Sequence, residues 1–197
     1  MEILRLGDPR LRQVSEPVAD VHDPAVVADG ERLMQALADF RAAHGFGRAI
    51  AAPQIGVFRR MIAVNFGAGP FVICNPVLRE KSEETMTVWD DCMSFPGIMV
   101  RVRRHRHITL DFELLADGSK HTFAHINEAA SELIQHEYDH LDGILSVDRA
   151  ETDGGAVRDA VIDAEQYRRA PDSFNSLVDY AIAPTIGASL TMAEGFA

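Results

Sequence analysis

The chain has 197 residues, of which 47% are hydrophobic and 25% charged, a composition that fits one soluble domain with a tail and excludes fibrous and disordered classes. No stretch approaches the roughly 18 apolar residues of a membrane span, and two cysteines are too few for a disulfide framework, so we expect a cytoplasmic protein with no membrane partner. The formal net charge of -11 argues against a protein that neutralises phosphates, so no nucleic-acid partner is expected.

The first 45 residues are predicted to form an arm followed by a helix. Pro9 and Pro17 break the opening segment, which we interpret as an extended arm lying over the domain. Asp23 and Pro24 are a plausible cap followed by proline at the first helical position, and apolar residues then recur at helical spacing until Gly45. This helix is predicted to serve packing.

A loop and two strands are predicted next. Residues 47–57 are rich in small side chains, so backbone can approach a ligand closely, and a proline fixes a turn that presents Gln54. Strands are predicted at residues 60–66 and 71–78. The second of them holds Cys74, which we interpret as a buried thiol that packs as a small hydrophobe.

The second cysteine has different surroundings. Residues 90–97 hold Cys92 between carboxylates and a Pro-Gly pair, which predicts a turn whose side chain can point into a cleft. The basic residues at 101–107 alternate with others and indicate the solvated face of a strand. Residues 107–115 and 121–123, joined by an Asp-Gly turn, predict an antiparallel hairpin.

The last part of the chain is predicted to hold one central helix and an acidic extension. Asn127 caps a helix that leads into the segment from Gln135 to Gly143. Residues 156–169 are predicted to form an acidic amphipathic helix after a Gly-Gly linker. We therefore predict a catalytic domain at residues 1–150 and, at residues 151–197, an acidic C-terminal extension made of a helix and an irregular tail.

The central helix carries the chemistry. His136 and His140 lie one turn apart and project from the same face, so both imidazoles can reach one metal ion while Glu137 stands beside them. This His-Glu-x-x-His pattern matches that of zinc-dependent proteases. Cys92 is the natural third ligand. The alternative, two histidines on a solvated helix face, has less support because the flanking residues and the cysteine turn add independent constraints.

Three protein ligands leave one position of the metal open for water, whose pKa a divalent ion lowers. Glu137 can then accept a proton and later deliver it to a leaving amine, which is the proton transfer that amide hydrolysis needs. The negative charge on the carbonyl oxygen needs hydrogen-bond donors. The side-chain amide of Gln54 and the backbone N–H of Met93 are the candidates.

Three motifs in this order resemble those of peptide deformylases. Residues 47–54 look like the first family motif, residues 90–94 like its Glu-Gly-Cys-Leu-Ser motif, and residues 135–143 like its Gln-His-Glu-x-Asp-His-Leu-x-Gly motif. The opening at residues 3–11 is also similar to the start of the family. The resemblance covers about residues 1–150.

The resemblance implies an α+β fold with mixed or antiparallel sheets around a central metal-binding helix, and one divalent metal ion held by Cys92 and the two histidines. The family metal is typically ferrous iron, which we expect here, with zinc, nickel or cobalt as alternatives. The resemblance also implies that Glu137 is the general base and acid and that Gln54 and Met93 form the oxyanion site. The substrate would then be a formylated peptide, from whose formylmethionine the formyl group is removed.

Several residues depart from the family pattern near the expected substrate pocket. We predict that this pocket is lined by Gly47, Arg48, Ala49, Asp91, Glu132 and Leu133. Ala49 and Asp91 stand where the family has glycine, and Met99 stands where some members carry an arginine. Arg48 and Glu132 replace residues that are usually apolar in the methionine pocket.

An unpaired charge in a dry pocket is costly. Arg48 and Glu132 therefore either pair, or lie in a wet pocket, or both point outward. The first two arrangements disfavour a methionine side chain. They favour an alternative, a deformylase-like amidohydrolase that acts on a different N-formyl or N-acyl substrate with a polar side group, such as a small formamide. A third hypothesis is a catalytically inactive binding homologue.

The acidic end of the chain bears on a possible partner. From Glu151 onward there are eight acidic and three basic residues, a local balance of -5. Family members that dock at the ribosome use a basic C-terminal helix, whereas an acidic segment would be repelled by RNA phosphates. The sequence therefore predicts no ribosome docking through this part.

Overall fold

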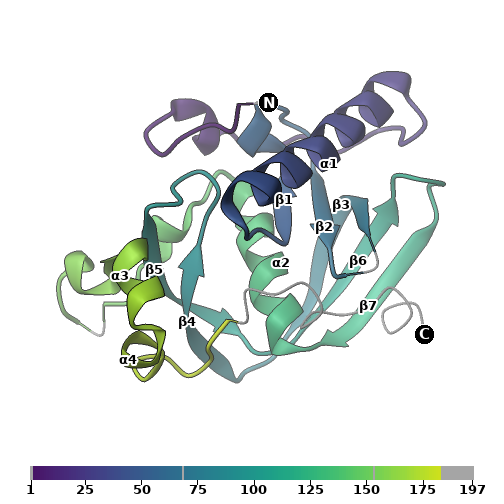
Figure 1. Cartoon of the computed structure of the whole chain (residues 1–197). Coiled ribbons are helices and arrows are strands. Elements are labelled where there is room, and N and C mark those ends of the chain that lie inside the picture. Colours follow the sequence, from purple (N-terminus) through teal and green to yellow (C-terminus); the bar gives the residue numbers. More distant parts are fainter. Residues whose placement is uncertain (1, 68, 153, 183–197) are drawn as a thin grey trace.

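Helix α2 (Glu128–Leu141) lies between two antiparallel sheets at the centre of the molecule (Figure 1). The computed structural model describes residues 2–67, 69–152 and 154–182. In this part of the chain the strands and helices form an α+β fold with a central helix, as predicted from the sequence. α2 contacts β1 of one sheet and β5 of the other, so residues from both sheets reach its faces.

The larger sheet has the order β1-β2-β3-β6-β7, and all neighbouring strands in it are antiparallel. Its strands are β1 (Ala49–Ala51), β2 (Met61–Asn65), β3 (Pro70–Lys81), β6 (Ile108–Leu114) and β7 (Lys120–Ile126). The predicted strands at residues 60–66 and 71–78 and the predicted hairpin are confirmed. β1 is an outer strand next to α2, so the loop before β1 comes close to the motif helix.

The smaller sheet has the order β4-β5-β8. Its strands are β4 (Thr85–Asp91), β5 (Ile98–His105) and β8 (Val161–Asp163). The prediction of a turn at Asp90 and Asp91 is wrong, because both residues pair with β5, and the turn starts at Cys92. The prediction of a solvated face at residues 101–107 is wrong for Arg104, whose side chain is 3% exposed because it points inward and binds Asp139 of α2 and Asp90 of β4.

The first long helix begins and ends as predicted, and α2 begins as predicted. α1 (Pro24–His44) starts at Asp23, whose side chain accepts a hydrogen bond from the N–H of Ala25, and it stops at Gly45 with a left-handed φ of 77°. Asn127 caps α2 by accepting a hydrogen bond from the N–H of Ala130. Twelve residues of α2 are buried, so this helix is a core element and its polar side chains need partners. No helix in the described residues is long and apolar enough to cross a membrane.

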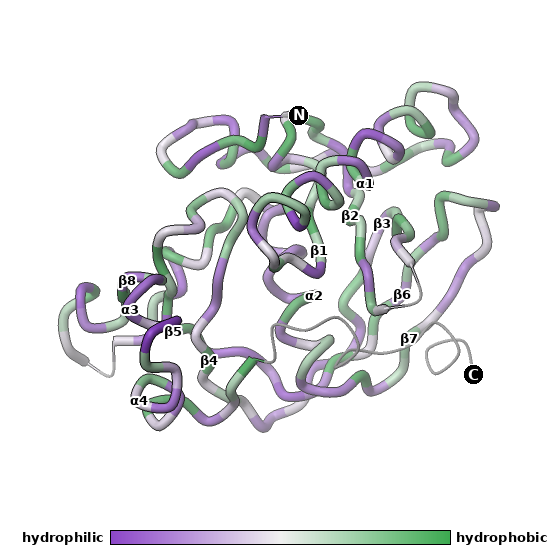
Figure 2. The backbone as a smooth tube through the Cα atoms, in the orientation of Figure 1, coloured by the Kyte–Doolittle hydropathy of each residue, from purple (hydrophilic) through white to green (hydrophobic). Residues whose placement is uncertain are grey.

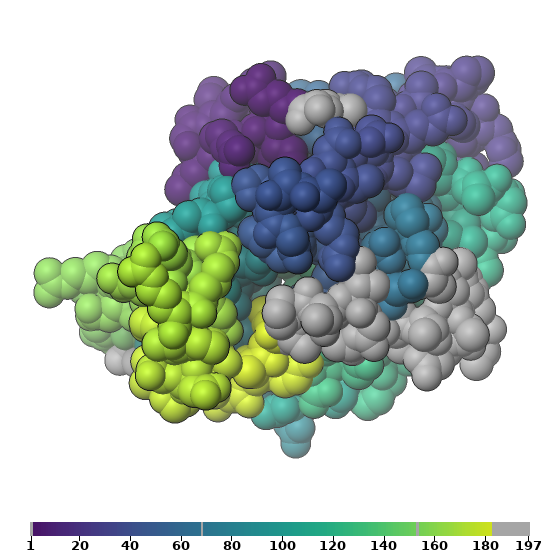
Figure 3. Space-filling model, in the orientation of Figure 1, coloured from purple at the N-terminus to yellow at the C-terminus, as the bar shows by residue number. Residues whose placement is uncertain are grey.

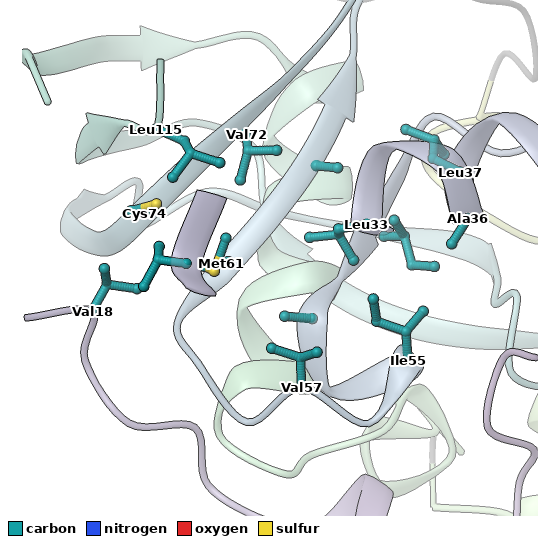
Figure 4. Close-up of a cluster of buried hydrophobic side chains, with 14 of the residues drawn as sticks. Val18, Leu33, Ala36, Leu37, Ile55, Val57, Met61, Val72, Cys74 and Leu115 are labelled. Carbon is teal, nitrogen blue, oxygen red and sulfur yellow. The ribbon is translucent and has the colours of Figure 1, made fainter. Parts of the chain in front are cut away.

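The core includes an apolar layer between α1 and the larger sheet (Figure 4). Leu33 and Leu37 of α1 pack in one cluster with Met61 of β2 and with Val72 and Cys74 of β3. Hydrophobic and hydrophilic residues interleave along α1, as expected of a helix with one face on the core (Figure 2). The interpretation of Cys74 as a buried thiol is confirmed, and burial raises its pKa to about 12.

The C-terminal segment differs from the prediction. The helix predicted at residues 156–169 is wrong for most of its length, since β8 lies in its middle and pairs with β5. The β-branched Val161 and Ile162 favour a strand here. Around β8 lie η4 (Val157–Ala160), α3 (Ala164–Arg169) and α4 (Pro171–Asn175). The predicted irregular tail beyond residue 182 lies outside the described residues, and the domain boundary at residue 150 stays a prediction.

Hydrogen bonds attach the C-terminal segment to β4. The indole N–H of Trp89 donates to the carbonyl of Phe174 at 2.9 Å. The carboxylate of Asp179 accepts from both the backbone N–H and the hydroxyl of Thr87, each at 2.9 Å. These hydrogen bonds hold the pKa of the Asp179 carboxyl below its usual value. Residues 161–180 are therefore fixed to the smaller sheet.

We expect Asp179→Asn to lower the melting temperature by about 2 °C or less at pH 7, because the lost interaction lies at the surface. A carboxyl whose pKa is lower in the folded state than in the unfolded state stabilises the fold at pH values above its unfolded-state pKa. This stabilisation is lost as the pH falls through its folded-state pKa. The difference in melting temperature between wild type and variant, measured by calorimetry from pH 7 to pH 3, should therefore disappear toward pH 3. Asp172→Asn, the same charge change on α4, is the control. A gap that stays constant with pH would contradict this assignment.

Candidate active site

Three buried donor atoms converge on one point beside α2. Cys92, His136 and His140 each offer a ligand atom, and these atoms all lie within 4.8 Å of one another. The Cys92 Sγ is 3.3 Å from His140 Nε2, which is 3.2 Å from His136 Nε2. One thiolate and two imidazoles, buried and directed at one point, fit a divalent transition-metal ion. The structure thus brings together the three residues predicted as ligands.

Local structure explains how Cys92 reaches the histidines. β4 ends at Asp91, and a turn closed by a hydrogen bond from the N–H of Phe95 to the carbonyl of Cys92 points the thiol inward. The backbone nitrogen of Ser94 lies 3.4 Å from the sulfur of Cys92 and donates to it. Burial raises the pKa of the Cys92 thiol, and a bound cation would act in the opposite direction by favouring the thiolate.

Gln54 lies next to the sulfur. Its side-chain oxygen accepts from the N–H of Ala51 at 2.8 Å, which turns its amide nitrogen toward Ser94 Oγ at 3.3 Å and Cys92 Sγ at 3.6 Å. Met93 follows the cysteine, and its carbonyl accepts from Arg5 at 3.2 Å. Both residues predicted for the oxyanion site therefore flank the metal-ligand cluster, and their role stays a prediction.

Glu137 stands beside the two histidines on the same helix. Its side chain is buried, and burial raises its pKa to about 7. One carboxylate oxygen, Oε2, has no hydrogen-bond partner in the described part of the chain. A buried carboxyl with an unpartnered oxygen and a pKa near neutrality is suited to take up and release a proton.

A cavity of about 500 Å³ opens over this centre. It is lined by all six residues predicted to bind substrate, namely Gly47, Arg48, Ala49, Asp91, Glu132 and Leu133, together with His136 and Glu137. Gly47 has a φ of 112°, a backbone conformation that residues with a side chain rarely adopt, so glycine is favoured at this point of the wall. Substrate binding by these residues stays a prediction.

Comparison with known proteins decides the family. The sequence model of the family described as polypeptide deformylase matches residues 1–154. The chain belongs to the peptide deformylase family. A peptide deformylase of Treponema pallidum is 36% identical over 151 residues, covering 76% of this chain and 87% of that protein. The recognition from three ordered motifs is therefore confirmed, and the zinc-protease pattern of the helix belongs to this family.

Solved structures of peptide deformylases share the fold. The crystal structure from Thermotoga maritima superposes with a TM-score of 0.68 at 31% identity, covering 76% of this chain and 97% of that one. A complex of the Synechococcus elongatus enzyme with actinonin gives a TM-score of 0.68 at 25% identity and covers 81% of this chain and 83% of that one. This deformylase is therefore a hydrolase, and the comparisons do not favour the alternative substrates.

A chain of charged groups that the sequence pattern did not reveal holds His136 in place. Asp90 lies 3.0 Å from Nδ1 of His136, and Arg104 donates to Asp90 at 2.8 Å and to Asp139 at 2.5 Å. Arg149 binds Asp139 through two hydrogen bonds of 2.6 Å. Burial alone would raise the pKa of Asp90, but His136 and Arg104 bring it down to about 2. A proton on Nδ1 leaves Nε2 free to bind a metal.

One signal in the sequence could have revealed this network. Asp139 lies inside the motif helix, and a carboxylate on a buried helix must have a cationic partner. The basic run at residues 101–107 is the nearest rich source of cations along the chain. The position of Arg104 on the inward face of β5 could not be read without the register between β4 and β5.

We expect Asp90→Asn to lower the affinity of the protein for a divalent metal by about 10- to 100-fold, since partners behind a ligating histidine fix its tautomer. Metal competition with a chromogenic chelator measures this affinity. Asp111→Asn, which changes a half-buried ion-paired aspartate on β6, is the matched control. Equal affinities for wild type and Asp90→Asn would show that the carboxylate does not orient His136.

Arg48 and Glu132 form a buried ion pair in the cavity wall. Arg48 Nη2 donates to Glu132 Oε1, and Nη1 donates to the carbonyl of Ala129 at 2.9 Å. Their side chains are only 6% and 2% exposed. The interpretation that both charges point outward is therefore wrong, and the predicted pairing is observed. The expectation that this pairing favours another substrate has no support from the comparisons, which favour the deformylase reading. Burial raises the pKa of Glu132 to about 7 even though Arg48 opposes this shift.

Proposed function

We propose that this deformylase uses one divalent metal ion, held by Cys92, His136 and His140, to remove the formyl group from formylmethionyl peptides. Ferrous iron is the proposed metal, with zinc, nickel or cobalt as alternatives. The observation that carries the proposal is the buried Glu137, which lines the cavity together with His136 and has an oxygen without a partner in the described residues, beside three converging ligand atoms. When bound, the ion would supply a Lewis acid and lower the pKa of a water molecule.

The side chains around this centre have distinct roles in the proposal. Glu137 takes a proton from the attacking water and delivers it to the amine nitrogen as the C–N bond breaks, which releases formate and a free amino terminus. The amide nitrogen of Gln54 and the backbone N–H of Met93 donate hydrogen bonds to the formyl oxygen. The network behind Asp90 keeps the ring of His136 in one orientation.

The sheet edges offer a place for the peptide. β1 and β4 are outer strands of their sheets in the described part of the chain, and Ala49 of β1 and Asp91 of β4 both line the cavity. An extended peptide can pair with exposed backbone groups of an outer strand. We infer that the substrate lies in extended form between these two edges, with its formyl group at Glu137.

The experiment is an assay of formate release by protein purified without oxygen, with the bound metal determined by elemental analysis. Formyl-Met-Ala should be hydrolysed, whereas acetyl-Met-Ala should not. Formyl peptides with a polar first residue test the alternative substrates. Failure on every formyl-methionyl peptide by metal-loaded protein would overturn the proposal and favour an inactive binding homologue. The expected cytoplasmic location and the absence of nucleic-acid and ribosome partners stay predictions.

A further inference from the structure

One wall of the cavity comes from a part of the chain that the family model does not match. That match ends at residue 154, whereas Tyr167, Arg168, Pro171 and Asn175 line the cavity opposite the loop before β1. Figure 3 shows the C-terminal segment, in yellow-green, next to the blue end of α1. Residues beyond the family match therefore help to line the cavity.

The position of this wall is fixed by several contacts. Ile162 of β8 pairs with Met99 of β5, and Asp163 then caps α3 by accepting from the N–H of Gln166 at 2.9 Å. Trp89, which lines the cavity, binds the carbonyl of Phe174 through its indole. α3 cannot shift away from the cavity without breaking these contacts.

Arg168 stands where the cavity meets solvent. Its guanidinium carbon lies 5.4 Å from the centre of the Phe46 ring, which belongs to the opposite wall. The side chain is exposed, and within the described residues it makes one polar contact, a long hydrogen bond of 3.5 Å to the carbonyl of Pro96. Stacking on an aromatic ring holds a guanidinium in place and leaves the N–H groups at its edge able to donate.

The other guanidinium of the cavity is already engaged. Arg48 is buried against Glu132 and the carbonyl of Ala129, whereas no carboxylate pairs with Arg168 in the part of the chain that the structure describes. A peptide whose formyl group lies at Glu137, on the buried floor of the cavity, must extend outward past Arg168 at the cavity mouth. Its main-chain carbonyl oxygens then need donors, because an extended peptide satisfies none of them internally.

We propose that Arg168 binds the main-chain carbonyl oxygens of the substrate peptide beyond its first residue. The inference rests on the proposed function, since it takes the formyl group to lie at Glu137. Arg168 is then a substrate-binding residue that distinguishes long substrates from short ones. It takes no part in the proton transfer and leaves kcat unaffected.

The test compares Arg168→Gln with Arg169→Gln, the neighbouring exposed arginine, which pairs with Glu165 and does not line the cavity. We expect Arg168→Gln to raise KM for formyl-Met-Ala-Ser about tenfold at unchanged kcat, the effect of losing a hydrogen bond to a charged donor. KM for formyl-Met amide, which has no further residue, should stay constant. Arg169→Gln should match wild type on both substrates.

Direct binding separates this proposal from the function on which it rests. In a Glu137→Gln background, calorimetric titration with formyl-Met-Ala-Ser should show the same tenfold loss for Arg168→Gln. If wild-type protein hydrolyses both substrates and Arg168→Gln changes neither KM nor affinity, the role of Arg168 is overturned and the proposed function stands. An equal rise in KM on both substrates would also overturn the role of Arg168, since that is the result of a general distortion. Wild-type protein inactive on both would overturn the proposed function instead.

Discussion

Glu137→Gln is expected to lower kcat for formyl-Met-Ala by about 10²- to 10⁴-fold, the range in which a positioned proton-transfer group contributes. Glutamine keeps the size of the side chain but cannot accept and return a proton. The measurement is formate release at saturating substrate, together with the metal content of the same samples. Metal content should be unchanged, because Glu137 is not one of the three converging ligands.

The same substitution should leave stability equal or higher. The buried carboxyl of Glu137 has an oxygen without a partner in the described residues, and burial disfavours its charged form, so loss of the charge removes a cost of folding. Glu128→Gln is the matched control, because it makes the same change at the half-buried start of α2. A kcat within tenfold of wild type at equal metal content would show that Glu137 is not the proton carrier.

Removing one member of the Arg48–Glu132 pair is expected to lower the free energy of unfolding by about 3–5 kcal/mol, because the remaining charge stays buried without a partner. At pH 7, Glu132→Leu should lower the free energy of unfolding more than Arg48→Met does. Arg48 stays charged when its partner is lost, whereas Glu132, whose pKa is already raised to about 7, can take up a proton. Urea denaturation of metal-loaded protein measures both effects.

The pH dependence and the double variant make this test specific. Because loss of Arg48 raises the pKa of Glu132 further, the cost of Arg48→Met in unfolding free energy should shrink mainly as the pH falls from 9 to 7, while that of Glu132→Leu should not. Arg48→Met combined with Glu132→Leu should lie within about 1 kcal/mol of wild type or above it. Arg79→Met, which breaks the surface pair with Asp111, should cost much less unfolding free energy than either single variant of the buried pair. If the double variant lost as much unfolding free energy as the two single variants together, the two side chains would not be coupled.

Local patterns predicted the centre of the site. His136, Glu137 and His140 are fixed relative to one another by the geometry of one helix, so their spacing in the sequence is also their spacing in space. Cys92 could be added because a turn between carboxylates and a Pro-Gly pair is a recognisable local structure. The caps at Asp23 and Gly45 were predictable for the same reason.

Contacts between distant segments account for what the sequence did not reveal. Arg104 reaches Asp90 and Asp139 only because β5 turns this one basic side chain inward. β8 is a strand because it pairs with β5, although acidic and apolar residues there also fit a helical pattern. The pairing of Arg48 with Glu132 was one of three arrangements that charge and burial allowed, and tertiary structure selected it.

The indole of Trp89 gives this architecture an optical probe. Trp89 is the only tryptophan of the chain, it is buried in the cavity wall, and its N–H binds the C-terminal segment at Phe174. Fluorescence excited in the indole absorption band therefore comes from one position in the cavity wall. That position contacts the C-terminal segment and would also contact a ligand bound in the cavity. Emission intensity and wavelength should thus report cavity occupancy and detachment of the segment without any added label.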